Sequence, residues 1–255
     1  MLYVNQEPTG VTHGRAMANE PDISVVIPAY NEAESIEECV CEVVSVLGQL
    51  GQSHEVVVVD DGSTDGTFAV LRSLRAQFPQ LRALRFRKNA GQTAAMAAGF
   101  ERARGDVVVT MDADLQNDPA DIPRLLDALG EFDVVCGIRE KRHDTFVRRI
   151  SSRIANGVRN WLTHESIRDV GCSLRAMKRE FLAELKLYDG MHRFLPTLLK
   201  LEGATVIEIP VNHRRRRRGR TKYGIRNRLF RGLRDLFAVR WMQRRWIRYE
   251  VEEEL

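Results

Sequence analysis

The sequence predicts an α/β fold built on a mostly parallel, doubly wound sheet. Short apolar segments alternate with amphipathic segments from residue 23 to about residue 138, and the connections between them are two to eight residues long. Strands and helices that alternate in this way form parallel sheets with helices on both faces. The G-x-G-x-x-G and Walker A motifs are absent from the sequence, which argues against a dinucleotide-binding or P-loop domain.

Five segments of this region have the composition of short strands. Residues 107–111, VVVTM, are mostly β-branched, and such a run suits a strand that is covered on both faces. The expected strands are residues 23–27, 56–59, 81–86, 107–111 and 133–138.

Helices are expected between these strands. Residues 32–50 carry apolar side chains at the helical period, and Asn31 with Glu34 forms a capping-box pattern at the start of this helix. The periodic positions are Ile36, Val40, Val43, Val44 and Leu47. The other expected helices follow the Asp- and Gly-rich turn at 60–67 to about residue 77, cover the Ala-rich residues 91–104, and open at Pro119 and Pro123.

The pattern changes after residue 138. We expect an Arg-rich helix over 146–162, a strand with a glycine kink over 169–176, and two short helices around Gly190. A last strand over 205–211, a basic loop over 213–223, a helix over 224–247 and an acidic tail follow. This reading divides the chain into a disordered leader (1–20), one globular domain (21–223), and a basic amphipathic helix with the acidic tail (224–255).

An acidic turn follows the strand at 107–111. Asp112, Asp114 and Gln116 alternate along it, so their oxygen-bearing side chains can converge on one point. Oxygen ligands of this kind suit Mg²⁺ or Mn²⁺, and ligands bind at the carboxyl ends of strands in open α/β sheets. The turn predicts a divalent-cation site, and we expect Asp114 to be exposed on it. Taken alone, the same residues would also fit a helix cap and a solvated carboxylate.

Composition limits the alternatives. No run of about 18 apolar residues predicts a spanning helix, and the N-terminus does not resemble a signal peptide. The cysteines show neither zinc nor CxxC spacing, which favours reduced thiols in a cytoplasmic protein.

The charge is distributed unevenly. The whole chain has a net charge of +4, but residues 212–248 contain fourteen Arg, one Lys and one Asp, so the remainder is acidic. Such a segment predicts an anionic partner, either a nucleic acid, a phosphate compound or an anionic membrane surface.

Five motifs occur together in this chain: PAYNE at 28–32, VVDDGSTDGT at 58–67, DADLQ at 112–116, RDVGCSLRA at 168–176 and RRRGRTKYG at 216–224. With MHRF at 191–194, they resemble glycosyltransferase family 2, and in particular its dolichol- and polyprenyl-phosphate sugar transferases. The resemblance implies a GT-A fold with a Rossmann-like sheet, and a metal-dependent, inverting transfer of a sugar from a GDP- or UDP-sugar to a dolichyl or undecaprenyl phosphate. It covers residues 22 to about 240.

The resemblance also implies roles for particular residues. The nucleotide-sugar site would comprise Pro28, Tyr30, Glu32, Asp61, Asp112 and Asp114. The metal ligands would be Asp112, Asp114 and Gln116. The acceptor phosphate would meet Arg139, Arg148, His192, Arg193, Arg216 and Lys222, with Thr221 in the same basic loop. The catalytic set would be Asp112, Asp114, Arg139, Arg148, Arg216 and Lys222.

The residues themselves leave some of these roles open. Asp61 could contact the base or ribose, or could cap an Asx turn. Arg148 could equally be a solvated helix charge, and nothing chooses between His192 and Arg193. No general base is assigned, because a lipid monophosphate is already an anion; charge and positioning would carry the catalysis.

Two further alternatives concern the partner. The protein could act on a soluble or carbohydrate acceptor, or it could bind nucleic acid through its arginine run. The second is disfavoured, because it leaves the acidic turn unexplained and no aromatic stacking platform accompanies the arginines. The helix over 224–247 combines an apolar face with arginines and tryptophans, which favours a peripheral position on the cytoplasmic face of a membrane. The same pattern also fits an ordinary helix that covers the domain and has solvated arginines. A separate membrane subunit is the alternative means of attachment.

Overall fold

The computed structural model of the protein describes residues 20–139, 157, 160, 162–163, 167–183, 185–215, 225–247 and 253. Its strands are β1 (Ile23–Ala29), β2 (His54–Asp60), β3 (Leu81–Arg85), β4 (Val107–Thr110), β5 (Val134–Arg139), β6 (Arg175–Lys178) and β7 (Val206–Val211). Its helices are α1 (Ile36–Gln49), α2 (Thr67–Gln77), α3 (Gln92–Arg102), α4 (Ile122–Ala128), α6 (Glu180–Ala183), α7 (Leu195–Leu201) and α8 (Ile225–Arg245), with 3₁₀ turns η1 (Pro119–Asp121) and η2 (Met191–Phe194).

The strands form one 7-stranded sheet in the order β3-β2-β1-β4-β6-β5-β7. The pairs β1–β2, β1–β4, β2–β3 and β5–β7 are parallel. Strand β6 is antiparallel to both of its neighbours, β4 and β5. The mostly parallel α/β sheet that the sequence predicts is therefore confirmed, with a single strand reversed.

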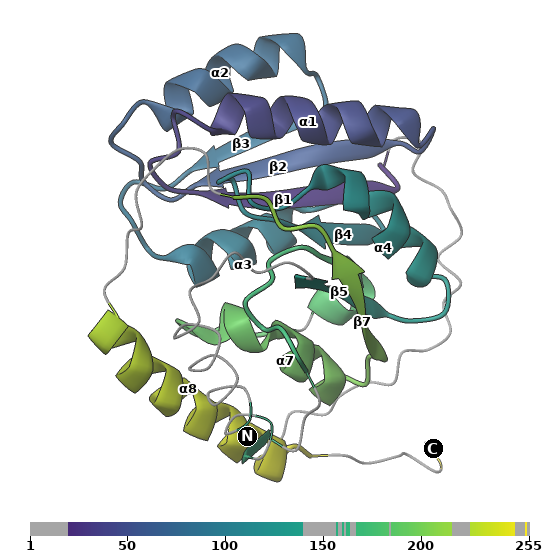
Figure 1. Cartoon of the computed structure of the whole chain (residues 1–255), viewed down its shortest axis with the longest axis vertical. Helices are drawn as coiled ribbons and strands as arrows, with labels where there is room; N and C mark the ends of the chain where they lie inside the picture. The colour runs from purple at the N-terminus through teal and green to yellow at the C-terminus, as the bar shows by residue number, and fades with distance from the viewer. Residues whose placement is uncertain are drawn as a thin grey trace.

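Helices cover both faces of this sheet (Figure 1). On one face α1, α2 and α4 pack through residues such as Val40, Leu71 and Leu125. On the other face α3 and α7 pack through Met96 and Leu195. Alternate valines of β1 and β2 point into the two cores, as the period of a strand requires.

Helix α8 lies outside this arrangement, on the side of α7 (Figure 1), and it packs against α7 and η2. Leu236 and Val239 of α8 join Met191, Phe194 and Leu198 in a third apolar cluster. Gly190 lies directly beneath the helix, since a Cβ there would meet Asp235 Oδ2 at 2.4 Å. Helix α8 is thereby packed against the segment that carries His192.

The expected capping box before α1 is wrong. Asn31 adopts a left-handed conformation (φ 52°), and its Oδ1 accepts a hydrogen bond from Thr64 N at 2.8 Å. The helix begins at Ile36, after Ser35. The reason is tertiary: the segment after β1 is hydrogen-bonded to the turn after β2, and Asn31 serves that contact instead of the helix.

The expected strand over residues 169–176 is correct only at its end. Strand β6 begins at Arg175. The preceding residues form a loop, because their polar groups bind distant partners rather than a neighbouring strand. Asp169, for example, accepts from Arg139 Nε at 2.7 Å.

Several expectations fall outside the described residues. These are residues 1–19 of the leader, most of the helix over 146–162, residues 216–223 of the basic loop, and residue 224 at the start of the last helix. Of the predicted helix over 146–162, residues 157, 160 and 162 are described, and all three are helical. The four cysteines all lie within the described ranges and are unpaired thiols.

The starts of β5 and β7 and the end of β6 are joined by Asp133. Its carboxylate accepts from Lys178 Nζ at 2.6 Å, and from Thr205 N at 2.8 Å and Thr205 Oγ1 at 2.6 Å. Burial alone would raise the pKa of Asp133, but the hydrogen bonds from Lys178 and Thr205 outweigh it and lower the pKa to about 2. A carboxyl group whose pKa falls on folding stabilises the protein above its unfolded pKa, and this contribution is lost as the pH drops towards 2.

We therefore expect Asp133→Asn to lower the free energy of unfolding by about 1–2 kcal/mol at pH 7. Because protonation removes the same interactions from the wild type, the difference should shrink as the pH falls from 4 to 2. Urea unfolding at several pH values measures it. A difference that is constant down to pH 2 would contradict the assignment.

Candidate active site

The candidate site lies where β1, β2 and β4 end. Strand β1 lies between β2 and β4 and runs parallel to both, so their carboxyl ends meet at one edge of the sheet. The acidic turn follows β4, and the N-terminus of α3 reaches the same place, because Gln92 Nε2 donates to Asp112 Oδ1 at 2.9 Å.

Asp112 is partly buried, and both of its carboxylate oxygens accept hydrogen bonds. Gln92 occupies Oδ1, and Ser173 Oγ donates to Oδ2 at 2.8 Å. The backbone N of Asp112 donates to Asn117 Oδ1 at 3.0 Å. These contacts fix the carboxylate before any ligand arrives.

Asp114 is only 8% exposed, so the expectation of an exposed turn is wrong. Its Oδ1 accepts from Gln116 N at 3.1 Å. Leu115, between them, is buried and has φ 62°, a left-handed conformation that is unfavourable for a residue with its side chain. Strain of this kind persists only where the surroundings impose it, and it gathers at functional sites.

The carboxylate of Asp114 perturbs that of Asp112. Burial and the negative charge of Asp114 raise the pKa of Asp112 to about 6, against the Ser173 hydrogen bond and the positive charges of Arg175 and Arg139. A divalent cation would relieve this repulsion, and the donor set, two carboxylates and an amide carbonyl, fits Mg²⁺ or Mn²⁺.

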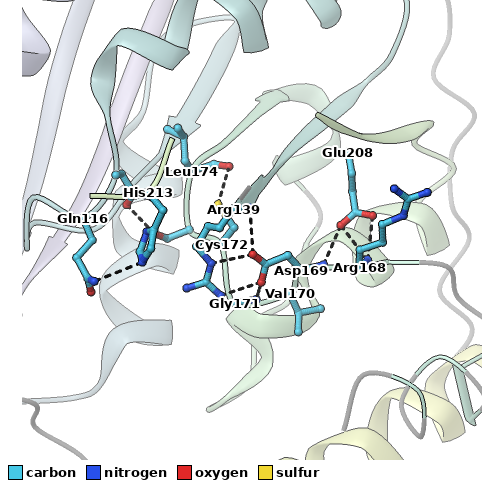
Figure 2. A network of polar contacts seen from close by, with 12 residues as sticks. Gln116, Arg139, Arg168, Asp169, Val170, Gly171, Cys172, Leu174, Glu208 and His213 are labelled. Atoms are coloured by element: carbon cyan, nitrogen blue, oxygen red, sulfur yellow. Dashed lines mark hydrogen bonds and ion pairs between the residues drawn. The ribbon is translucent and has the colours of Figure 1, made fainter. Parts of the chain in front are cut away.

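The third predicted ligand, Gln116, points its amide nitrogen at His213 Nε2, 3.4 Å away (Figure 2). Its carbonyl oxygen is thus the end that could reach a cation. Within the described ranges, no three His, Cys, Asp or Glu side chains are grouped so that they could hold a metal. A cation here would therefore need oxygen atoms from a ligand to complete its shell, as Mg²⁺ sites usually do.

The residues predicted for nucleotide binding surround the ends of β1 and β2. Pro28 lies in β1, and Tyr30 and Glu32 follow it. The two turns are joined, because Asp61 N donates to Ala29 O at 2.8 Å and Glu32 N donates to Thr67 Oγ1 at 2.9 Å. The structure thus brings Pro28, Tyr30, Glu32 and Asp61 together.

The carboxylate of Asp61 is engaged by protein groups. Oδ1 accepts from Ala90 N at 2.7 Å, and Oδ2 accepts from Gly91 N at 2.9 Å and Asn89 Nδ2 at 2.8 Å. Burial raises its pKa, the backbone hydrogen bonds of Ala90 and Gly91 oppose this, and the charge of Asp60 adds to it. Asp61 therefore holds the loop that starts α3, a role that neither sequence alternative included.

Arg139, predicted to meet the acceptor, forms a bidentate ion pair with Asp169. Its Nε and Nη2 lie 2.7 Å and 2.8 Å from the two carboxylate oxygens (Figure 2). A Cβ at Gly171 would meet Arg139 Nη2 at 2.6 Å, so the pair needs glycine there. Since the charge of Arg139 lowers the pKa of Asp112, the guanidinium lies near the acidic turn.

His192 is tied to the start of α3. Its Nδ1 lies 2.7 Å from Thr93 Oγ1, which also accepts from Gly190 N at 3.0 Å. Thr93 follows Gln92, so His192 contacts the neighbour of the residue that holds Asp112, and Arg193 follows His192 in η2. Arg148, Arg216, Thr221 and Lys222 lie outside the described residues.

Sequence reasoning missed five side chains around Asp112. They are Gln92, Thr93, Asn117, Ser173 and Arg175. Arg175 is 3% exposed, and its Nη1 donates to His192 O at 3.1 Å and its Nη2 to Val170 O at 3.0 Å. The only available signal was that Ser173 and Arg175 lie inside the RDVGCSLRA motif.

The basic loop starts from a fixed point. Arg214 donates from Nη1 to Glu42 Oε2 at 2.6 Å and from Nη2 to Asp118 Oδ1 at 2.8 Å, and its backbone N donates to Gln116 O at 2.9 Å. The first of the five consecutive arginines is thus a structural clamp beside the acidic turn.

A family model described as glycosyl transferase family 2 matches residues 24–186 of this chain. The undecaprenyl-phosphate 4-deoxy-4-formamido-L-arabinose transferase of Edwardsiella ictaluri is 41% identical over 80% of this chain and 63% of that protein. The dodecaprenyl-phosphate galacturonate synthase of Rhizobium johnstonii is 38% identical over 88% of this chain and 68% of that protein. The chain spans 63% of the length of the first of these relatives.

Solved structures have a similar fold. A mannosyltransferase from Pyrobaculum calidifontis, in complex with GDP-Man and Mn²⁺, has a TM-score of 0.62 at 24% identity and covers 87% of this chain and 64% of that one. Glucosyl-3-phosphoglycerate synthase from Mycobacterium tuberculosis, with Mg²⁺ and UDP, has a TM-score of 0.64 at 22% identity and covers 90% and 81%. At these identities the likeness shows the fold alone, and the expected GT-A fold is confirmed.

The geometry predicts how cation binding responds to substitution. We expect Asp114→Asn to abolish Mn²⁺ binding in the presence of UDP or GDP, because it removes one of two carboxylates. Ser173→Ala should weaken Mn²⁺ binding about tenfold, because it frees Asp112 to rotate. Electron paramagnetic resonance of free Mn²⁺ measures both.

The matched control is Asp127→Asn, which removes a carboxylate from the exposed side of α4. It should bind Mn²⁺ like the wild type. If Asp114→Asn bound Mn²⁺ with unchanged affinity, the acidic turn would not be the cation site.

Proposed function

Since the chain belongs to glycosyl transferase family 2, we propose that it transfers a sugar from a nucleotide-sugar donor to a polyprenyl phosphate at a membrane surface. The single observation that carries this proposal is the pair Asp112 and Asp114, which is partly buried at the end of β4 and held beside the turns that follow β1 and β2. That arrangement can bind a nucleotide diphosphate through a cation.

The donor would bind with its base and ribose against Pro28, Tyr30, Glu32 and Asp61. Mg²⁺ or Mn²⁺ on Asp112, Asp114 and Gln116 would neutralise the diphosphate and its charge as a leaving group. In support, the archaeal and mycobacterial proteins with this fold have been solved with Mn²⁺ or Mg²⁺ and nucleotides. Gln92 and Ser173 would keep Asp112 oriented throughout.

The part of the site that binds the acceptor phosphate needs positively charged side chains rather than a general base. A lipid monophosphate is an anion near neutral pH, so the difficulty is to bring it close to the donor phosphates. Arg139, His192 and Arg193 would orient it, together with Arg148, Arg216, Thr221 and Lys222. Asp169 would fix the plane of the Arg139 guanidinium, which suits bidentate recognition of phosphate.

The names of the relatives support a lipid acceptor. One relative is named as a transferase of undecaprenyl phosphate and the other as a synthase of a dodecaprenyl-phosphate sugar. A donor and acceptor screen tests this part of the proposal. We expect the purified protein with Mn²⁺ to transfer sugar from at least one GDP- or UDP-sugar to undecaprenyl phosphate, and at least tenfold more slowly to soluble phosphate or carbohydrate acceptors.

The Asp114→Asn variant is the internal control of this screen, and we expect it to transfer no sugar. Equal transfer to a soluble acceptor would favour the other branch of the family and overturn the lipid assignment.

Membrane attachment would be peripheral and would use the outer side of α8. Among the described residues, no helix is long and apolar enough to cross a bilayer. The expected apolar face comprises Ile225, Leu229, Leu233, Leu236 and Phe237; the structure describes the side chains of the last three, and these are split. Leu236 is 4% exposed and packs inward, whereas Leu233 and Phe237 are 38% and 62% exposed.

Leu233, Phe237 and Trp241 follow one another at intervals of four residues, so they form an exposed apolar stripe, with Trp246 and Ile247 beyond it. Arg234, Arg240, Arg244 and Arg245 flank the stripe. An apolar stripe with Trp and flanking Arg is typical of a helix in the interface of an anionic bilayer, on the cytoplasmic face in this proposal. The alternative is that the same stripe binds a separate membrane subunit instead of the lipid, and the flotation experiment below distinguishes the two.

We expect the protein to float with anionic liposomes and to do so less as salt rises, because surface charges are screened within about 8 Å at physiological ionic strength. Phe237→Ser/Trp241→Ser should remove most of the binding, and Arg240→Gln/Arg244→Gln should remove its preference for anionic lipid. Liposome flotation measures both effects.

The control Arg72→Gln/Arg75→Gln removes the same charge from α2, at the far end of the molecule from α8 (Figure 1). It should float like the wild type. Binding that is equal for anionic and neutral liposomes, or absent from both, would contradict the membrane proposal and favour a protein anchor.

A further inference from the structure

Glu208 holds a loop that leads to the candidate site. It lies in β7, opposite Cys136 of β5. Its carboxylate accepts from Arg168 N, at 3.0 Å and 2.9 Å from the two oxygens, and from Asp169 N at 3.0 Å (Figure 2). Hydrogen bonds from backbone N–H groups to a carboxylate are roughly twice as strong as neutral ones. Glu208 therefore fixes the first two residues of the loop.

The next contact in the chain is the ion pair of Asp169 with Arg139. Asp169 is 4% exposed, and its Oδ1 also accepts from Gly171 N at 3.2 Å. The position of the guanidinium depends on the position of this carboxylate, and the backbone that carries the carboxylate is the part bound by Glu208. A shift of Asp169 would therefore move Arg139.

The same loop ends at the metal-binding carboxylate. Ser173 donates to Asp112 Oδ2 at 2.8 Å, and Ser173 O accepts from Thr110 Oγ1 at 2.7 Å. Arg175 Nη2 holds the middle of the loop through Val170 O. Residues 168–174 thus connect Glu208, at the edge of the sheet, to both Arg139 and Asp112.

We propose that Glu208 is a positioning residue of the transferase site. It acts on the reaction through the start of the loop 168–174, by fixing Asp169 and hence Arg139. The inference rests on the proposed function only for its effect on catalysis. Its effect on the position of Arg139 can be measured without any substrate.

The kinetic test uses Glu208→Gln. The amide keeps one oxygen and places an NH₂ group against the N–H groups of residues 168 and 169. We expect kcat to fall about tenfold, in the range seen when supporting residues around a metal site are lost. The KM for the nucleotide sugar should stay within about twofold, because the residues proposed to bind base and ribose follow β1 and β2. Glu131→Gln, which removes the same charge from an exposed turn, should match the wild type.

A double-mutant cycle separates this role from a general loss of stability. If Glu208 acts through Asp169, the variant Asp169→Asn/Glu208→Gln should have a kcat within about twofold of Asp169→Asn alone, since coupled residues are not additive. Additive losses, or a wild-type kcat in Glu208→Gln, would overturn the proposal.

A spectroscopic readout keeps the inference independent of the activity. The Nε–H of Arg139 is held by Asp169 and should exchange slowly with solvent; Arg139→Lys identifies its signal in an ¹H–¹⁵N spectrum. In Glu208→Gln we expect its exchange to be at least about tenfold faster. Unchanged exchange would overturn the inference. If the wild type transferred no sugar from any donor, the proposed function would fail, while this measurement would still decide whether Glu208 positions Arg139.

Discussion

The structure of this site depends on the repulsion between two carboxylates that are only slightly exposed. Asp112 and Asp114 are two residues apart at the end of β4, where the charge of Asp114 makes the ionised form of Asp112 less favourable. Burial of such a pair is tolerated only if hydrogen bonds and positive charges compensate. The contacts of Gln92, Ser173 and Arg175 near the pair come from two segments that are distant in the chain, the start of α3 and residues 173–175. The acidic turn thus determines which loops must meet.

The sequence predicted those features that depend on local pattern. The strands, most of the helices and the acidic turn were all visible from residue type and spacing, because their physical causes lie within ten or fifteen residues. Asn31 was misread for the opposite reason: its side chain binds Thr64, which is distant in the chain. The contact of Asp61 with the loop at 89–91 was missed for the same reason, since competition between distant partners leaves no local trace. The same holds for the segment 169–174, whose composition resembles a strand.

Antiparallel β6 was also beyond the reach of pattern analysis. A short segment such as Arg175–Lys178 has the same residue pattern in either direction, so its orientation depends on the path of the chain that precedes it. That reversal is what matters for the site. It brings the loop ahead of β6 to the carboxyl ends of β4 and β5, so Ser173 and Asp169 reach residues at the ends of both strands. A parallel strand in this place would have directed its preceding loop to the opposite edge of the sheet.

The left-handed Leu115 has a consequence for how this chain can vary. Its backbone conformation favours glycine or asparagine, whereas its side chain is 3% exposed in the main core and favours a large aliphatic residue. No amino acid satisfies both demands. A glycine would relax the turn but leave a cavity, and any other aliphatic residue would keep the strain. The position is therefore a local optimum from which every single substitution is a loss, and divergence at residue 115 would require a compensating change in the neighbouring core.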